Sequence, residues 1–278
     1  MALGARGRVV IEIEKRLPVQ GGLGGASGNA VAALLGLERA LKKRLPGPER
    51  LRIAAEVGSD LPLFLVGGTV LGVGRGEEVY PAPDLPSFPC VIALPEVAVS
   101  TPQAFAEWDT AVSSGLVELR STWAGEGARP HMANLPHIGT GGLPASKLTA
   151  DSPSDRMNLF SRELSSWLSG SVSSGVSARR GGRAETLLDL VRTGIENDFE
   201  RVVFPKYPEL REVKRVLERA GAIYASLSGS GSAVYGLFAS RATAVKAAGK
   251  LRKNGTAAVV TTALTRRQYW KKFQVSGF

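Results

Sequence analysis

The feature that most constrains this chain is the glycine-rich stretch Pro18–Ala30, which joins an expected strand to an expected helix. Its glycines remove the Cβ atoms that would keep a ligand away from the backbone, and they permit positive φ angles. The following residues, Asn29–Leu41, are good helix formers, with Ser27 or Asn29 as the expected N-cap. Because a helix N-terminus presents unpaired N–H groups and the positive end of the dipole, the stretch predicts a phosphate-binding loop.

Two widespread phosphate loops do not fit this stretch. No Lys follows the glycines, as the Gly-x4-Gly-Lys-Ser/Thr loop requires. The dinucleotide fingerprint Gly-x-Gly-x-x-Gly does not match, because Ser27 occupies the position of the third glycine when the motif is counted from Gly22. A glycine-rich turn that serves only tight packing is the alternative interpretation.

The composition of the 278 residues is that of a globular protein, with 44% hydrophobic and 22% charged residues. The longest apolar run, residues 61–73, is broken by three glycines, so we expect no membrane span. The first eight residues lack an apolar signal core, and the single Cys90 excludes an intrachain disulfide. These features predict a soluble, cytoplasmic protein.

The formal net charge of +10 raises the question of a nucleic-acid partner. The basic residues are spread along the chain, mostly at helical spacing, and do not form one stripe interleaved with aromatic residues. We therefore expect a solvated basic face and no nucleic-acid partner, although such a field also favours a polyanionic small substrate. The sequence makes no prediction of the oligomeric state.

Asp60 is the candidate catalytic carboxylate. It lies between a helix expected at Pro48–Val57 and an apolar strand expected at Leu63–Val66. From this bend a carboxylate can point into a cleft, but Asp also commonly caps a turn, and the local sequence alone favours that plainer interpretation.

A second glycine-rich turn, Ser228–Ser232, connects strands expected at Ala222–Leu227 and Ala233–Phe238. Taken alone it predicts a tight hairpin. Period-2 and period-3.6 patterns predict the other elements. The strands are Val9–Ile13, Cys90–Leu94 and Ala257–Thr262, and the helices are Tyr207–Ala222, Arg241–Lys253 and one that begins at Thr101.

The middle of the chain, at about residues 121–184, is rich in Gly, Ser and Pro, and we assign it no function. Within it, Asp155–Leu168 has the apolar spacing of an amphipathic helix. His131 and His137 are the only histidines, and they have no Cys or carboxylate cluster beside them. We therefore expect no metal site at these histidines.

Three motifs resemble the GHMP kinases, which phosphorylate small metabolites. Residues 18–30, Pro-x-x-x-Gly-Leu-Gly-Gly-x-Ser-x-Asn-Ala, are similar to their ATP-binding loop. Gly-Ser-Asp-x-Pro-x-Phe around Asp60, followed by Gly-Gly-Thr and Gly-x-Gly-Arg-Gly-Glu, resembles their catalytic segment. Ser-Gly-Ser-Gly-Ser at 228–232, approached through Asn-Asp-Phe-Glu at 197–200, resembles their third motif. The resemblance covers most of residues 8–110 and 186–275.

The resemblance implies an α+β fold of two domains, divided at the proline-rich stretch 81–89. Residues 1–84 would be the truncated remainder of a ribosomal-protein-S5-like ATP-binding domain. Residues 85–278 would be a ferredoxin-like domain that carries the 121–184 insert.

The resemblance also implies Asp60 as catalytic base, ATP as phosphoryl donor with Mg²⁺ on its phosphates, and a small-molecule substrate; the ligands of the metal are not implied. The implied cofactor-binding residues are Pro18, Gly21, Gly22, Leu23, Gly24, Gly25, Ala26, Ser27, Gly28 and Asn29. The implied substrate-side loop is Ser228, Gly229, Ser230, Gly231 and Ser232.

One branch of the family is especially similar, namely the kinases of the non-mevalonate isoprenoid route, which act on a diphosphocytidyl sugar alcohol. Its loop also has Asn after Ser, although Ala26 and Gly28 here replace a Gly and a Ser of the branch. A GHMP kinase of the mevalonate or homoserine type and a non-catalytic nucleotide-binding remnant are the alternatives.

The family's chains begin with several strands and a catalytic lysine, for which Lys15 is not the counterpart. We therefore expect an N-terminally truncated form in which the strand Val9–Ile13 has an open edge.

Overall fold

The structure is a computed structural model, and it describes residues 8–15, 17–18, 21–82, 84–114 and 196–275. All of them belong to one compact unit, formed by residues 1–117 and 178–278. The 121–184 insert, the helix expected at Asp155–Leu168 and both histidines lie outside the described residues. Among the described helices, none is long and apolar enough to cross a membrane.

The C-terminal half is built on a four-stranded antiparallel sheet with the strand order β4-β5-β3-β6. Its strands are β3 (Pro89–Leu94), β4 (Tyr224–Leu227), β5 (Val234–Leu237) and β6 (Ala257–Thr262). Because β3 pairs antiparallel with both β5 and β6, these two strands run parallel to each other with β3 between them. This is the split β-α-β arrangement of a ferredoxin-like domain.

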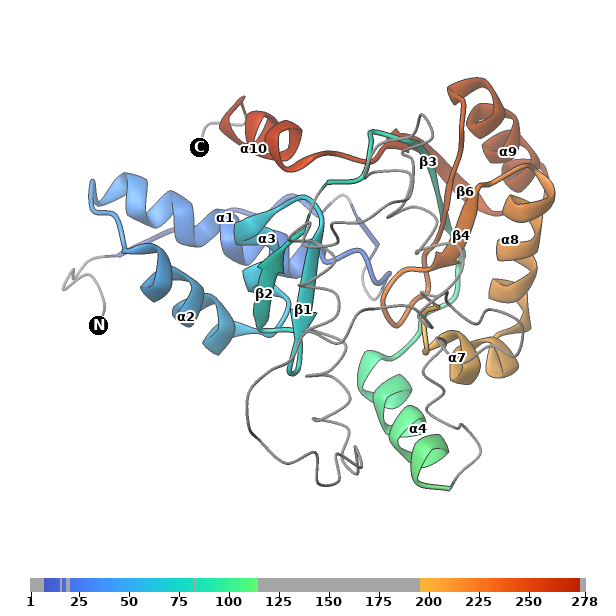
Figure 1. Cartoon of the computed structure of the whole chain (residues 1–278), viewed down its shortest axis with the longest axis horizontal. Helices are drawn as coiled ribbons and strands as arrows, with labels where there is room; N and C mark the ends of the chain where they lie inside the picture. Colours follow the sequence, from blue (N-terminus) through green and yellow to red (C-terminus); the bar gives the residue numbers. More distant parts are fainter. Residues whose placement is uncertain (1–7, 16, 19–20, 83, 115–195, 276–278) are drawn as a thin grey trace, which may run out of the picture. The chain divides into compact units, whose positions relative to one another are not determined.

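Two amphipathic helices cover this sheet (Figure 1). α8 (Pro208–Arg219) packs on β4 and β5, and α9 (Arg241–Lys253) packs on β3 and β6. Two further helices complete the half, α4 (Thr101–Ser113) and α7 (Glu200–Lys206). The largest of the fully buried side chains are Phe238, Leu210, Leu217, Leu227 and Leu251.

The N-terminal half contains three helices and a two-stranded hairpin. The helices are α1 (Gly25–Ala40), α2 (Gly47–Val57) and α3 (Leu61–Val66), and the strands are β1 (Val70–Val73) and β2 (Glu78–Pro81). α3 packs against all four of the others. α1 and α2 are also joined by the buried Glu38, which accepts hydrogen bonds from both Nε and Nη2 of Arg50 at 2.9 Å.

The last helix, α10 (Arg266–Val275), returns to the N-terminal half and packs on α3. Tyr269 donates a hydrogen bond to the Phe64 carbonyl at 2.9 Å, and Trp270 Nε1 donates one to the Val66 carbonyl at 3.1 Å. The sequence analysis missed α10, although Tyr269, Trp270 and Phe273 have the i, i+1, i+4 spacing of one helix face.

Several predicted elements are confirmed. The strands at Cys90–Leu94 and Ala257–Thr262 and the helix at Arg241–Lys253 are present as β3, β6 and α9. The predicted helix at Tyr207–Ala222 is α8, and the turn Ser228–Ser232 joins β4 to β5 as a hairpin.

Two strand predictions are wrong. Residues 8–15 form no strand, and no described strand pairs with them; Val9, Val10, Ile11 and Ile13 are exposed. Without a ladder partner, alternating residues alone do not make a strand. Leu63–Val66 belongs to helix α3, because Pro62 suits a first helical turn and a short apolar run does not distinguish a strand from a buried helix.

The predicted N-cap of α1 is also wrong. The helix begins at Gly25, and its N-cap is Gly24, not Ser27 or Asn29. Gly24 adopts a left-handed conformation, with φ 65° and ψ 20°, which a glycine reaches without steric cost.

Candidate phosphate-binding and catalytic site

The first turn of α1 carries the features of an anion site. Its first intrahelical hydrogen bond runs from the Gly28 N–H to the Gly24 carbonyl, at 2.8 Å. The amides of Gly25, Ala26 and Ser27 therefore precede the helical ladder, and within the described residues they donate to no other backbone group. No side chain caps the turn, and no acidic residue lies in it. The turn is suited to a phosphate.

The glycines of the loop differ in what surrounds them. A Cβ on Gly22 would lie 1.9 Å from the Ser228 carbonyl oxygen, and a Cβ on Gly24 would lie 2.3 Å from Cζ of Phe64. Both residues have positive φ angles. By contrast, a Cβ on Gly28 would meet the Phe64 ring at an ordinary 3.8 Å. Gly22 and Gly24 thus allow close packing, while the unpaired amides begin just after them.

The two glycine-rich segments, far apart in sequence, lie against each other. Ser228 Oγ donates to the Gly22 carbonyl at 2.8 Å, and the Ala233 N–H donates to the Gly21 carbonyl at 3.1 Å. The hairpin turn is also bound to α4, because the Ser230 hydroxyl forms a hydrogen bond with Thr101 Oγ1 at 2.8 Å. The structure therefore brings the predicted substrate-side loop to the predicted cofactor loop.

Asp60 lies at the start of α3, which packs against α1. It is exposed, and its carboxylate accepts no capping hydrogen bond from the helix. The ring of Phe64, one turn further along the same face, lies where Cβ atoms on Gly24 and Gly28 would meet it, at 2.3 and 3.8 Å. The carboxylate is thus one helical turn from a residue that borders the glycine loop, and the capping role favoured by the local sequence is not the one it has here.

The segment Asn197–Glu200 contacts the hairpin of this site through hydrogen bonds. Asn197 and Glu200 hydrogen-bond the end of β4, where the hairpin turn begins. Between them, burial raises the pKa of Asp198; Arg201 opposes this shift and Glu196 adds to it. The sequence analysis placed this segment in the approach to the third motif without giving its residues a role, because its partners at the hairpin lie 26 to 32 residues away.

The described residues do not favour catalysis by a cysteine nucleophile or by a metal centre built from His, Cys, Asp or Glu side chains. Burial raises the pKa of the Cys90 thiol to about 11, so it is not a nucleophile at neutral pH. Among the described residues there is no group of three or more His, Cys, Asp or Glu side chains that could hold a metal ion.

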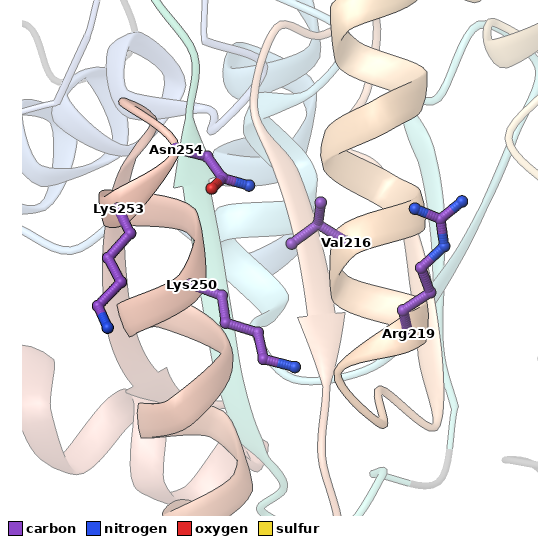
Figure 2. Close-up of a pocket in the computed structure, with 5 residues that line it drawn as sticks. All are labelled: Val216, Arg219, Lys250, Lys253 and Asn254. Atoms are coloured by element: carbon purple, nitrogen blue, oxygen red, sulfur yellow. The ribbon is translucent and has the colours of Figure 1, made fainter.

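Two hollows lie elsewhere on the described surface. One of about 380 Å³ separates residues 9–14 from α1, and of the predicted site residues Asn29 lines it. Figure 2 shows the other, of about 280 Å³, between the C-terminal ends of α8 and α9. It is lined by Val216, Arg219, Lys250, Lys253 and Asn254, none of which belongs to the predicted site.

The fold and the two facing glycine-rich segments define a GHMP kinase. The N terminal domain of GHMP kinases matches residues 2–68, and the C terminal domain matches residues 177–257. A crystal structure of homoserine kinase from Cytophaga hutchinsonii has the same fold, with a TM-score of 0.52 and 18% identity over 90% of this chain and 68% of that one.

More similar relatives narrow the family. The 4-diphosphocytidyl-2-C-methyl-D-erythritol kinase of Solibacter usitatus is 32% identical over 98% of this chain and 69% of its own length. That of Oleidesulfovibrio alaskensis is 35% identical over 84% of this chain and 67% of its own length. A crystal structure of 4-(cytidine 5'-diphospho)-2C-methyl-D-erythritol kinase matches with a TM-score of 0.56 and 25% identity, over 90% of this chain and 68% of that one.

The chain belongs to the 4-diphosphocytidyl-2-C-methyl-D-erythritol kinase family. The predicted family and the predicted two-domain α+β GHMP kinase fold are confirmed. The chain spans about two-thirds of the length of these relatives.

Proposed function

We propose that this chain is an ATP-dependent kinase that phosphorylates the 2-hydroxyl of 4-diphosphocytidyl-2-C-methyl-D-erythritol, in the non-mevalonate route to isoprenoids. The names of its relatives support the substrate. One observation carries the proposal: three amides that donate to no described backbone group open α1, beside a hairpin and a helix that are packed against the same glycine loop.

In this proposal the amides of residues 25–27 bind the phosphates of ATP, and Asp60 accepts the proton of the substrate hydroxyl. Phosphoryl transfer depends mainly on positioning and on charge stabilisation, so a set of fixed amides and one carboxylate contribute directly. The turn Ser228–Ser232 forms the wall on the substrate side. Magnesium is proposed as the counter-ion of the ATP phosphates, and we assign it no protein ligand.

The remaining assignments are part of the same proposal. Residues 1–84 are assigned to the ATP-binding domain and residues 85–278 to the second domain, with its insert at about 121–184. We also propose a cytoplasmic location, because the sequence contains a single cysteine and therefore no intrachain disulfide. We propose no nucleic-acid partner, because the basic residues are spread along the chain.

The test is the release of ADP from ATP in the presence of each candidate acceptor. We expect release with 4-diphosphocytidyl-2-C-methyl-D-erythritol and none above background with homoserine or mevalonate. Release with homoserine or mevalonate in its place would assign the chain to a different GHMP kinase. ATP binding without transfer to any acceptor would identify a nucleotide-binding protein that is not a kinase.

A further inference from the structure

We propose that Asn197 is a positioning residue, which fixes the hairpin turn Ser228–Ser232 so that this turn aims two amides of the glycine loop at the nucleotide. The proposal rests on the proposed function for the identity of the ligand. The orientation of the loop follows from this chain's own contacts.

Asn197 holds the start of the turn with one side chain, on either side of Ser228. Its Nδ2 donates to the Leu227 carbonyl at 2.9 Å and to the Gly229 carbonyl at 2.7 Å. Its Oδ1 accepts the Phe199 N–H at 3.0 Å, which fixes the direction of the amide group. Both donors and the acceptor of this one side chain are thus used, and two of its three partners belong to the turn or to the residue before it.

Glu200 holds the same strand end from a second side. Its Oε1 accepts the Leu227 N–H at 2.9 Å and the Ser226 hydroxyl at 3.0 Å. Its Oε2 accepts a hydrogen bond from Lys214 Nζ at 2.5 Å. Bonds to a charged acceptor are stronger than neutral ones, so the start of the turn is anchored to α7 and α8.

The anchored turn in turn orients the glycine loop. The carbonyls of Gly21 and Gly22 accept hydrogen bonds from Ala233 and Ser228. Both following peptide bonds are trans. In a trans peptide the C=O of one residue and the N–H of the next point in opposite directions. The N–H groups of Gly22 and Leu23 therefore point away from the hairpin, and we infer that they face the same ligand as the amides of residues 25–27.

This arrangement makes a distant residue control the loop. Asn197 touches neither Gly21 nor Gly22 in any hydrogen bond of the described structure. It fixes the carbonyls on either side of Ser228, which binds the Gly22 carbonyl, in the hairpin whose Ala233 binds the Gly21 carbonyl. Loosening the turn releases the two peptide planes and lets their amides rotate. The expected consequence is a loss of anion affinity that exceeds the loss of stability.

The first test is hydrogen exchange of the Ala233 amide, which donates to the Gly21 carbonyl, measured on the protein without nucleotide. Asn197→Ala should speed its exchange about tenfold, since it removes two hydrogen bonds from the turn. Asn197→Asp should do so as well, because a carboxylate offers no donor to the two carbonyls. The matched control is Asn254→Ala, the same change at the exposed end of α9, which should leave the exchange of Ala233 unchanged.

The second test is ATP affinity by titration calorimetry at a temperature where every variant is folded. Asn197→Ala should weaken ATP binding about tenfold, and Asn254→Ala should not. Ser228→Ala removes the hydroxyl bond to Gly22 by itself, and its effect combined with Asn197→Ala should be less than additive because both act through one turn.

Each outcome decides one of the two claims. Faster exchange confined to Leu227 and Ser228, with Ala233 unchanged, would show that Asn197 serves only the start of the turn and would overturn the positioning role. Unchanged ATP affinity in a variant with a loosened turn would overturn it too. If the unaltered protein fails to bind ATP, the proposed function fails, and the exchange measurement still decides the role of Asn197. If Asn197→Ala does not fold, Ser228→Ala alone applies both readouts.

Discussion

The two halves of this chain are held together by different means. The C-terminal half has a continuous core that runs from Val91 to Ala258, whereas the fully buried apolar cluster of the described N-terminal half consists of Val31, Ala54 and Leu61. The N-terminal half is instead tied down by contacts from the other half, namely the hairpin turn on Gly21 and Gly22 and the helix α10 on α3. The glycine loop and Asp60 therefore lie on the half with the smaller core, and the C-terminal half contributes the turn Ser228–Ser232 to the site.

This difference indicates that mutations in the C-terminal core and mutations at the glycine loop should affect different properties, namely folding stability and ligand affinity. A side chain removed from the C-terminal core should cost mainly folding free energy. Removing a bond from the hairpin to Gly21 or Gly22 should cost mainly ligand affinity, since these bonds hold the loop in one orientation. The predictions below test this separation.

The largest expected effect is in the C-terminal core. Phe238→Ala should lower the free energy of unfolding by about 3–5 kcal/mol, because it empties a fully buried site. Phe64→Ala, the same change at a half-buried residue of the N-terminal half, should cost less. Urea unfolding of both variants compares them, and an equal loss would contradict the contrast between the two halves.

A comparison of glycines separates the loop from the core. Gly22→Ala should introduce about 1–3 kcal/mol of strain, because the residue has φ +66° and its Cβ would meet the Ser228 carbonyl. ATP affinity should fall about 10- to 100-fold, by the conversion of 1.4 kcal/mol per tenfold.

Gly249→Ala is the matched control for that change. It lies inside α9 with nothing within 4 Å of its Cβ position, so it should stabilise the protein by about 0.5–1 kcal/mol and leave ATP affinity unchanged. If the Gly22→Ala variant binds ATP as tightly as the Gly249→Ala variant, the glycine loop does not contribute to ATP binding.

The tie between α10 and α3 has a moderate expected effect. Tyr269→Phe removes the bond to the Phe64 carbonyl and should cost about 0.5–1.5 kcal/mol of unfolding free energy. Tyr80→Phe, at an exposed residue, should cost nearly nothing. Thermal unfolding measures both, and equal melting temperatures would mean that α10 does not stabilise the N-terminal half.

The smallest expected effect is a pH dependence at Asp198. Burial raises the pKa of this carboxyl in the folded state, so the charged form costs stability once the pH rises above the ordinary value of 3.8. Asp198→Asn should therefore stabilise the protein slightly at about pH 7, and the gain should shrink towards about pH 4. A gain of the same size at both values would assign the effect to something other than this titration.

Particular residues show how far the sequence alone reaches. The glycine spacing of Pro18–Ala30 and the apolar periods of α8, α9 and β3 were sufficient to predict a loop, two helices and a strand, because local chemistry specifies them. The same local chemistry misassigned Leu63–Val66, where a four-residue apolar run fits either period. It also predicted a strand at Val9–Ile13, where no described strand supplies a partner.

The site was predictable only in part, for a physical reason. Each glycine-rich segment could be recognised by itself, and the family resemblance placed them in one site. The contacts that orient them, from Ser228 to Gly22 and from Asn197 to Gly229, join residues 206 and 32 positions apart. No period or spacing in a sequence encodes such pairs, so they emerged only from the structure.

The most direct test of the central claim is single-turnover phosphoryl transfer from ATP to 4-diphosphocytidyl-2-C-methyl-D-erythritol by Asp60→Asn, with ATP affinity measured on the same preparation. The account predicts that transfer falls by about 10²–10⁴-fold, as expected for the loss of a catalytic base, while ATP affinity stays within about twofold, because the phosphates bind the amides of residues 25–27. Transfer at the unaltered rate would contradict the account.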